Sequence, residues 1–220
     1  MIHLSTIVAT GSLIPAALAI SGRHALPRFI TLTLAHIAGT GLLTPQGTIK
    51  PLNLSLLWPY HAALRTKLAL QRAVSDEPAW NAVTPHYFIG AWPSEQALVP
   101  ALNASVLDVT CELPLQVQPP AYLSIPVWDT HCPTPAQLDA AVLWAERQVA
   151  AGRTVLVHCA HGHGRSAAVL AAILIARGVA ETPEEAEALM RAQRPRVKLN
   201  ARQRRGVELW ARSRDLKRTE

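Results

Sequence analysis

One short stretch of the chain, VHCAHGHGRSAAV at Val157–Val169, contains residue types that could perform nucleophilic chemistry. Cys159 comes directly after an apolar, β-branched run, and Arg165 stands where an apolar helix is expected to begin. A loop between a buried strand and a helix N-terminus holds anions, because its backbone N–H groups point inward and the helix dipole adds partial positive charge. Gly162 and Gly164 allow the backbone to turn without Cβ clashes. This pattern predicts an anion-binding loop.

Cys159 and Arg165 have complementary expected roles in such a loop. The Arg165 guanidinium can form two hydrogen bonds to phosphate oxygens, and the positive field of the loop lowers the pKa of the Cys159 thiol. A thiolate beside a bound phosphoryl group is a nucleophile, so a cysteinyl-phosphate intermediate is expected. The hydroxyl of Ser166 is expected to assist the sulfur as it leaves in the second step. His158 is expected to order the loop through hydrogen bonds rather than to act as a base.

Protonation of the leaving oxygen requires an acid on a separate, mobile loop. The segment IPVWDTHCPTP, about thirty residues before the cysteine, places Asp129 in a loop bounded by prolines. Asp129 is therefore the predicted general acid. His131 is the reserve candidate, and Asp139 is a poorer one because it falls inside the predicted following helix.

Further polar residues surround this centre. His161 and His163 either bind an anionic group when protonated or pack at the rim of the loop, which we favour. Cys111 and Glu112 follow a predicted strand, and ligand sites in such sheets lie at strand carboxyl ends. Glu112 is expected either to orient Arg165 or to face solvent. Cys111 and Cys132 are each candidates to form a disulfide with Cys159 under oxidation. The alternative, which we favour for both, is that they are small buried apolar residues.

The elements that position these residues alternate along the chain after a change of composition at residues 75–78. Thr134, Thr182 and Asn200 are the expected N-caps of three of the helices. Strands alternating with helices predict an α/β domain over residues 76–220, with a central, mostly parallel sheet flanked by helices. The expected strands are 86–90, 105–110, 122–125 and 154–157, and the expected helices are 135–151, 165–177, one after Thr182 and one after Asn200.

Residues 1–75 differ in composition, because they contain no Asp or Glu. Residues 1–20 are apolar enough and long enough to span a bilayer, whereas residues 29–43 are short for a span, and Trp58 and Tyr60 are of the kind found at membrane interfaces. We predict an apolar, helical, membrane-associated region, with contact through residues 1–60. A cleaved targeting segment and an organellar transit peptide are the alternatives. Positive residues flank both apolar segments, so the topology stays open.

The basic charge is concentrated at the C-terminus. Residues 191–220 carry eleven Lys and Arg against three Asp and Glu, which is either a solvated helix face or a contact for an anionic partner. We expect no nucleic-acid partner. Three scattered cysteines form no disulfide scaffold and no zinc-ligand pattern, and a free reactive thiol implies a reducing compartment such as the cytoplasm. No metal or cofactor is expected, and the sequence leaves the oligomeric state open.

The motif HCxxGxxRS at His158–Ser166 resembles the signature of the cysteine-based protein phosphatases. The position of Asp129 and the small size resemble the dual-specificity branch, and the similarity runs from about Val83 to Trp210. It includes TPHYFIGAWPS and RPRVKLNARQRRGVELW, and the loop CAHGHGRS together with LDVTCELP is similar to small membrane-anchored members of bacteria and plants. The acid loop WDTHCP departs from the family pattern.

The resemblance implies the protein tyrosine/dual-specificity phosphatase fold, with Cys159 as nucleophile, Arg165 as phosphate clamp, Ser166 as leaving-group helper and Asp129 as acid. The residues that then form the phosphate-binding loop around Cys159 are His158, Ala160, His161, Gly162, His163 and Gly164. The expected activity is dephosphorylation of phosphotyrosine, phosphoserine and phosphothreonine proteins. A phosphorylated lipid headgroup is the alternative substrate, and a non-catalytic phosphate-binding module or a rhodanese-like sulfur transferase are the alternatives of other classes.

Overall fold

A computed structural model describes residues 58–95, 98–101, 103–113 and 116–219 of the 220-residue chain. Most of the predicted membrane-associated region, residues 1–57, lies outside the described residues. Within the described part of the chain, no helix combines the length and the apolar character needed to cross a bilayer.

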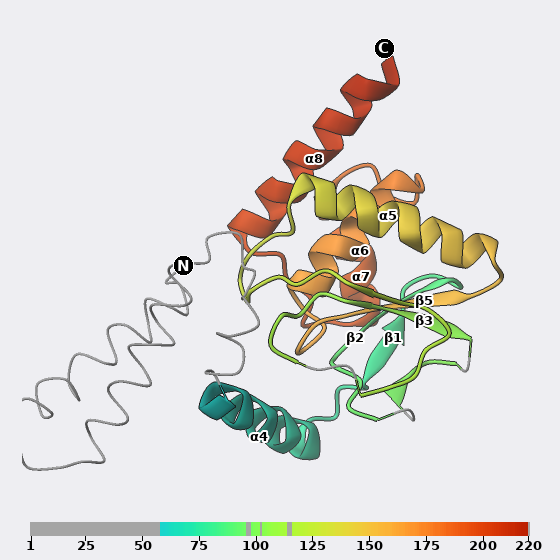
Figure 1. The fold of residues 1–220 in the computed structure, drawn as a ribbon. Helices are drawn as coiled ribbons and strands as arrows, with labels where there is room; N and C mark the ends of the chain where they lie inside the picture. Colours follow the sequence, from blue (N-terminus) through green and yellow to red (C-terminus); the bar gives the residue numbers. More distant parts are fainter. Residues whose placement is uncertain (1–57, 96–97, 102, 114–115, 220) are drawn as a thin grey trace, which may run out of the picture.

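A five-stranded sheet forms the centre of the domain (Figure 1). Its strands are β1 (Trp80–Ala82), β2 (Tyr87–Gly90), β3 (Ala104–Asp108), β4 (Tyr122–Ser124) and β5 (Thr154–His158). Their order in the sheet is β1-β2-β5-β3-β4, and only the β1–β2 pair is antiparallel. The predicted mostly parallel sheet is confirmed, and β5 lies at its middle.

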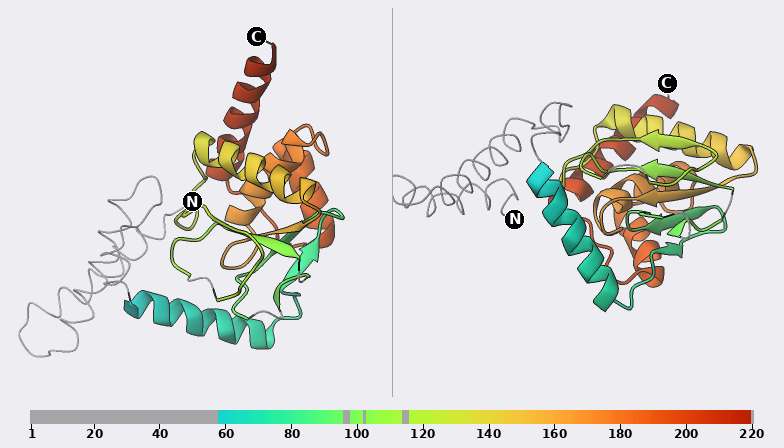
Figure 2. Two further views of the ribbon diagram at one scale, coloured as in Figure 1. Left: turned by 45° about the vertical axis from the view of Figure 1, so that its right-hand side comes forward. Right: turned by 60° about the horizontal axis from the view of Figure 1, so that its bottom comes forward.

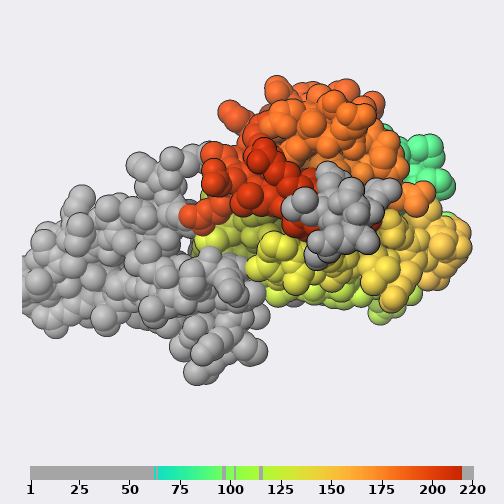
Figure 3. Space-filling view, turned by 90° about the horizontal axis from the view of Figure 1, so that it is seen from above, coloured from blue at the N-terminus to red at the C-terminus, as the bar shows by residue number. Residues whose placement is uncertain are grey.

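Four helices follow in the C-terminal part: α5 (Pro135–Ala150), α6 (Arg165–Ala176), α7 (Pro183–Gln193) and α8 (Ala201–Thr219). Ten of the twelve residues of α6 are buried, because this helix packs between the sheet and the other helices. Seen from above, α8 lies between α5 and α7 (Figure 3). The predicted α/β class is confirmed, and the predicted strands and helices end within one or two residues of the observed bounds.

The helix caps explain why these helices start where they do. Thr134 forms a full capping box with Gln137, and Asn200 forms a second one with Gln203, whose Oε1 accepts from the Asn200 N–H at 3.1 Å. Thr182 caps α7 as expected, because its hydroxyl accepts from the N–H of Glu185, but no capping box forms, since the Glu185 carboxylate accepts from the N–H of Glu181.

Two elements escaped sequence analysis. β1 has three residues, too few for a periodic signal. Helix α4 (Trp58–Val74) falls in the region assigned to the membrane-associated segment, and it lies apart from α5–α8 on the opposite side of the molecule (Figures 1 and 2). The division of the chain at residue 75 stays a prediction.

Helix α4 packs against the loops that follow three strands. Leu64 and Leu68 form a small apolar cluster whose other members follow β2, β3 and β5: Trp92, Leu113 and Ala160. The guanidinium of Arg72 donates to Ser94 Oγ at 2.6 Å and to the carbonyl of Trp92. The helix therefore covers part of the edge where the parallel strands end.

Candidate active site

The predicted anion-binding loop joins β5 to α6. Gly162 has a positive φ of 75°, and a Cβ there would clash with the carbonyl carbon of Gly90, so this position requires glycine. Gly164 differs from the prediction, because its φ of −111° is open to any residue. Its constraint is space instead, since a Cβ would come within 3.1 Å of the side-chain amide of Gln203.

Cys159 is buried at the base of this loop. Its Sγ accepts from the backbone N–H of Gly162 at 3.3 Å and lies 3.4 Å from Ser166 Oγ. Burial alone would raise the pKa of the Cys159 thiol, but the positive charge of Arg165 and the hydrogen bonds from Ser166 and the backbone lower it below the usual thiol value. The geometry brings together the predicted nucleophile and the predicted leaving-group helper.

Arg165 is held in a buried ion pair. Its Nη1 and Nη2 donate to the two Glu112 carboxylate oxygens at 2.9 and 2.6 Å, and Nη1 also donates to the carbonyl of Val127. Burial opposes the charge on each partner, yet their mutual attraction raises the pKa of Arg165 and lowers that of Glu112. Glu112 was expected either to orient Arg165 or to face solvent, and the structure shows that it binds Arg165.

The Nε–H of Arg165, together with the second N–H of Nη2, is left to donate to a ligand. The Nε atom is buried without a hydrogen bond, and it lies 3.4 Å from Asp129 Oδ1, close enough for an ion pair. A phosphoryl group in the loop would satisfy this buried donor, which otherwise costs free energy.

The structure places Asp129 at the site and Asp139 elsewhere. The Asp129 side chain faces Arg165 and is 51% exposed, so a substrate can reach it. Asp139 lies on α5, where its Oδ1 accepts from Trp210 Nε1 at 2.7 Å. His131, the reserve candidate, is buried, and its Nδ1 donates to the carbonyl of Asp129 at 3.1 Å.

The cap of α8 holds the acid loop in place. Asn200 Nδ2 donates to the carbonyl of Thr130 at 2.9 Å, and Gln203 Nε2 donates to that of His131 at 3.2 Å. Thr130 has a φ of 68°, a conformation that persists only when the surroundings impose it. Sequence analysis identified Asn200 as a cap but missed its second role.

His158 ends β5, directly before Cys159. The ring is buried, with Nδ1 donating to the carbonyl of Cys159 at 3.4 Å and Nε2 lying 3.7 Å from Asp108 Oδ1. Burial lowers the pKa of His158 despite the carboxylate nearby, and the ring is too buried to exchange a proton with a substrate at the surface.

His161 and His163 lie on the side of the loop that faces α4. His161 Nε2 donates to the side-chain oxygen of Gln71 at 2.9 Å, and His163 Nε2 donates to Glu77 at 2.8 Å. Burial lowers the pKa of both rings. These partners favour the expectation that the histidines pack at the rim.

Sequence analysis missed Arg194, which it counted within the basic C-terminal segment. The side chain is 1% exposed, and it binds the backbone of the catalytic loop. Its partners are the carbonyls of Gly162 (3.2 Å), His161 (2.9 Å) and Pro78 (2.8 Å), Asn81 Oδ1 (2.8 Å) and the Glu77 carboxylate (3.1 Å). Its place before a proline, at the start of the stretch RPRVKLNARQRRGVELW that resembles the phosphatase family, was the available signal.

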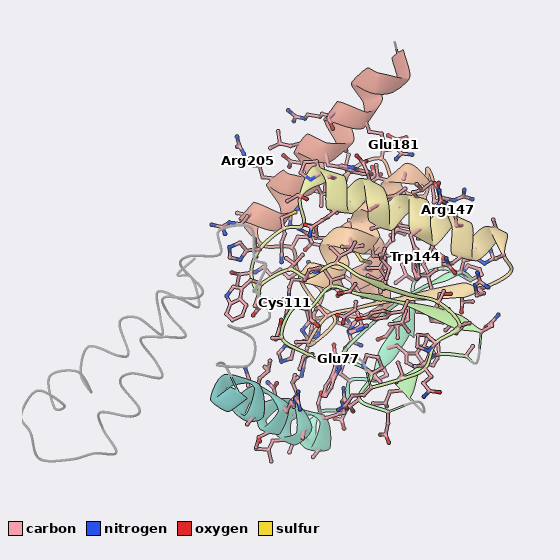
Figure 4. The ribbon with its side chains drawn as sticks, in the orientation of Figure 1. Glu77, Cys111, Trp144, Arg147, Glu181 and Arg205 are labelled. Atoms are coloured by element: carbon pink, nitrogen blue, oxygen red, sulfur yellow. The ribbon has the colours of Figure 1, made fainter. Side chains whose placement is uncertain are left out.

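The remaining cysteines are free and partly buried. The Sγ of Cys111 donates to Glu112 Oε2 at 3.4 Å, and burial together with the Glu112 charge raises its pKa. Burial raises the pKa of Cys132 to about 12. Both thiols are protonated near neutral pH, which agrees with the favoured expectation of small buried residues. Figure 4 shows Cys111 and Glu77 on the part of the molecule nearer to α4.

Comparison with known proteins supports a phosphatase domain. Residues 109–212 match the family model described as the Swiss Army Knife protein, DSP-PTPase phosphatase domain. Human DUSP28 is 26% identical, with a TM-score of 0.54 over 63% of this chain and 96% of its own. Tk-PTP in its active form is 25% identical, with a TM-score of 0.55 over 61% of this chain and 97% of its own. No curated protein matches the sequence.

PTPMT1, crystallised in complex with PI(5)P, shares the fold at 20% identity, with a TM-score of 0.53 over 63% of this chain and 98% of its own. Together the family model and these neighbours support the dual-specificity phosphatase family and phosphatase activity.

Proposed function

We propose that the protein hydrolyses phosphomonoesters through a cysteinyl-phosphate intermediate. The Cys159 thiolate attacks phosphorus, the bond from phosphorus to the leaving oxygen breaks, and Asp129 transfers its proton to that oxygen. Water then attacks the phosphocysteine, Asp129 takes up a proton from it, and the P–S bond breaks to release inorganic phosphate. The Ser166 hydroxyl donates to the sulfur as the thiolate departs.

The observation that carries this proposal is the environment of Cys159. Its sulfur lies between the Gly162 N–H and the Ser166 hydroxyl, beside an arginine that the Glu112 carboxylate holds in place. This combination stabilises a thiolate and leaves the Nε–H of Arg165 for the phosphoryl oxygens. Asp129 supplies the proton from the exposed side.

Two substrate classes are candidates. Phosphotyrosine, phosphoserine and phosphothreonine proteins are the class that the sequence favours. A phosphorylated lipid headgroup is the second candidate, because a pocket rich in arginine adjoins the catalytic loop, and α4 connects that loop to the apolar N-terminal region. Membrane attachment through residues 1–60, with the domain facing the cytoplasm, is part of this proposal and rests on the sequence.

Phosphate release from a substrate panel tests the proposal. The panel contains phosphotyrosine and phosphoserine peptides, p-nitrophenyl phosphate and phosphorylated lipids in mixed micelles, with Cys159→Ser as the control. We expect release by the wild type and none by the variant. Turnover by Cys159→Ser near the wild-type rate would refute the nucleophile assignment. Phosphate binding without release by either protein would indicate a binding module, and sulfur transfer from thiosulfate would indicate the rhodanese-like chemistry.

A further inference from the structure

A cavity of about 490 Å³ lies beside the catalytic loop on the side covered by α4. The charged and titratable residues in its lining are Arg72, Glu77, His161, His163, Arg194 and Arg196. Three arginines thus face one carboxylate. That carboxylate, Glu77, is already engaged by His163 at 2.8 Å and by Arg194 at 3.1 Å, so the cavity carries a net positive charge.

The arginines differ in how far they are committed to the protein. Arg194 is buried and bound to backbone carbonyls, and Arg72 donates to Ser94 and Trp92. Arg196 is exposed, and it has no hydrogen bond or ion pair with the described residues. Its planar guanidinium is available for a bidentate interaction with an oxyanion.

The cavity adjoins the catalytic centre. Ala160, the residue after Cys159, forms part of its wall. The charges that act on His161 include those of Lys67 on α4, His163, Asp129 and Arg165. A ligand in the cavity therefore lies against the loop in which the phosphoryl group would bind.

We propose that this cavity binds a second anionic group of the substrate. The inference rests on the proposed phosphatase activity and deepens it: the substrate is a compact phosphomonoester that carries another phosphate, as monoester or diester. A volume of about 490 Å³ accommodates such a group together with part of the scaffold that joins it to the reacting phosphate. A lipid headgroup and a soluble polyol phosphate share this chemistry.

Helix α4 gives the site its specificity. Leu68, Gln71, Arg72 and Val74 of α4 line the cavity, and Gln71 also binds His161. These four residues lie outside residues 109–212, which match the family model. A phosphatase domain without this helix would lack one wall of the cavity.

Binding to the full-length Cys159→Ser protein tests the proposal without requiring turnover. The probes are inositol 5-phosphate, inositol 1,5-bisphosphate and dioctanoyl phosphatidylinositol 5-phosphate, measured by calorimetry. We expect the bisphosphate to bind about tenfold tighter than the monophosphate, because its second phosphate gains charge-assisted hydrogen bonds. If the lipid binds more tightly than the bisphosphate, the substrate is a lipid. If the two bind equally, the headgroup phosphates account for the binding, and a soluble polyol phosphate is an equally good ligand.

Substitution of Arg196 provides the matched comparison. Arg196→Gln should reduce the ratio of the two inositol phosphate affinities severalfold, whereas Arg205→Gln, which removes the same charge from exposed α8, should leave the ratio unchanged (Figure 4). Equal affinity of the Cys159→Ser protein for both inositol phosphates, or a ratio unaffected by Arg196→Gln, would overturn the inference. Hydrolysis of p-nitrophenyl phosphate by the wild type separates this failure from failure of the proposed function.

Discussion

The ion pair between Arg165 and Glu112 yields the sharpest test of how the site is built. Both side chains are almost completely buried, at 2% and 1% exposure, and the carboxylate engages the guanidinium at 2.6 and 2.9 Å. Removing one partner of a buried pair costs about 3–5 kcal/mol, since the other charge stays buried without compensation. Glu112→Gln keeps the size and one acceptor, so we expect a loss of about 3 kcal/mol.

This loss has a measurable size. For a chain of 150–250 residues each kcal/mol shifts the melting temperature by about 2–4 °C, so Glu112→Gln should melt about 6–12 °C below the wild type. The assay is thermal unfolding of the full chain followed by circular dichroism. Phosphatase activity should fall as well, because Arg165 loses its orientation.

A surface pair serves as the control. Glu184 pairs with Arg204 at 2.7 Å, but the two side chains are 52% and 33% exposed, so Glu184→Gln should cost at most about 1 kcal/mol. The double variant Glu112→Gln/Arg165→Gln should lose less stability than the two single variants together, because no buried charge is left alone. A Glu112→Gln protein that melts with the wild type would refute the reasoning.

Three further predictions concern the chemistry. Asp129→Asn should slow hydrolysis of esters with poor leaving groups by about 10²–10⁴-fold, whereas Asp139→Asn should leave the dependence of rate on the leaving group unchanged. Steady-state rates for a series of aryl and alkyl phosphates test both variants. If only Asp139→Asn changed this dependence, Asp139 and not Asp129 would be the general acid. Ser166→Ala should slow the second step by roughly 10–100-fold, so that a burst of leaving group precedes steady turnover in stopped-flow measurements, and a variant without a burst would place Ser166 outside that step. Because Arg165 and Ser166 lower the pKa of Cys159 despite its burial, kcat/KM should rise with pH at a value below the ordinary thiol pKa of about 8.5. Ser166→Ala should shift this rise to higher pH. A rise at the ordinary thiol pKa in the wild type would contradict the lowered pKa of Cys159.

The local features of the site follow from residues that are close together in the sequence. The apolar run before Cys159, the glycines, and the apolar residues after Arg165 predict a strand, a turn and a helix, and the structure contains these elements in that order. Local hydrogen bonds also determine where helices begin, and the caps at Thr134 and Asn200 were therefore predictable. Such features depend on contacts within about one turn of chain, which sequence patterns record directly.

The contacts that shape the site join residues far apart in sequence. Glu112 meets Arg165 across 53 positions, and Arg194 binds the Gly162 carbonyl across 32. Sequence analysis left the role of Glu112 open and assigned Arg194 to a charged segment, because a charge pattern does not reveal whether its members are buried. Sequence analysis had preferred Asp129 to Asp139, and the structure adds that Trp210 of α8 binds the Asp139 carboxylate.

Sequence alone thus predicted the kind of chemistry and determined the local unit that could perform it, a cysteine, an arginine and a serine at fixed spacing between a strand and a helix. Only the tertiary structure showed that Glu112 binds Arg165, that Arg194 supports the loop, and that α4 packs against the loop. The physical reason is that burial and long-range ion pairs depend on how the elements pack, and packing brings together side chains whose separation along the chain carries no signal.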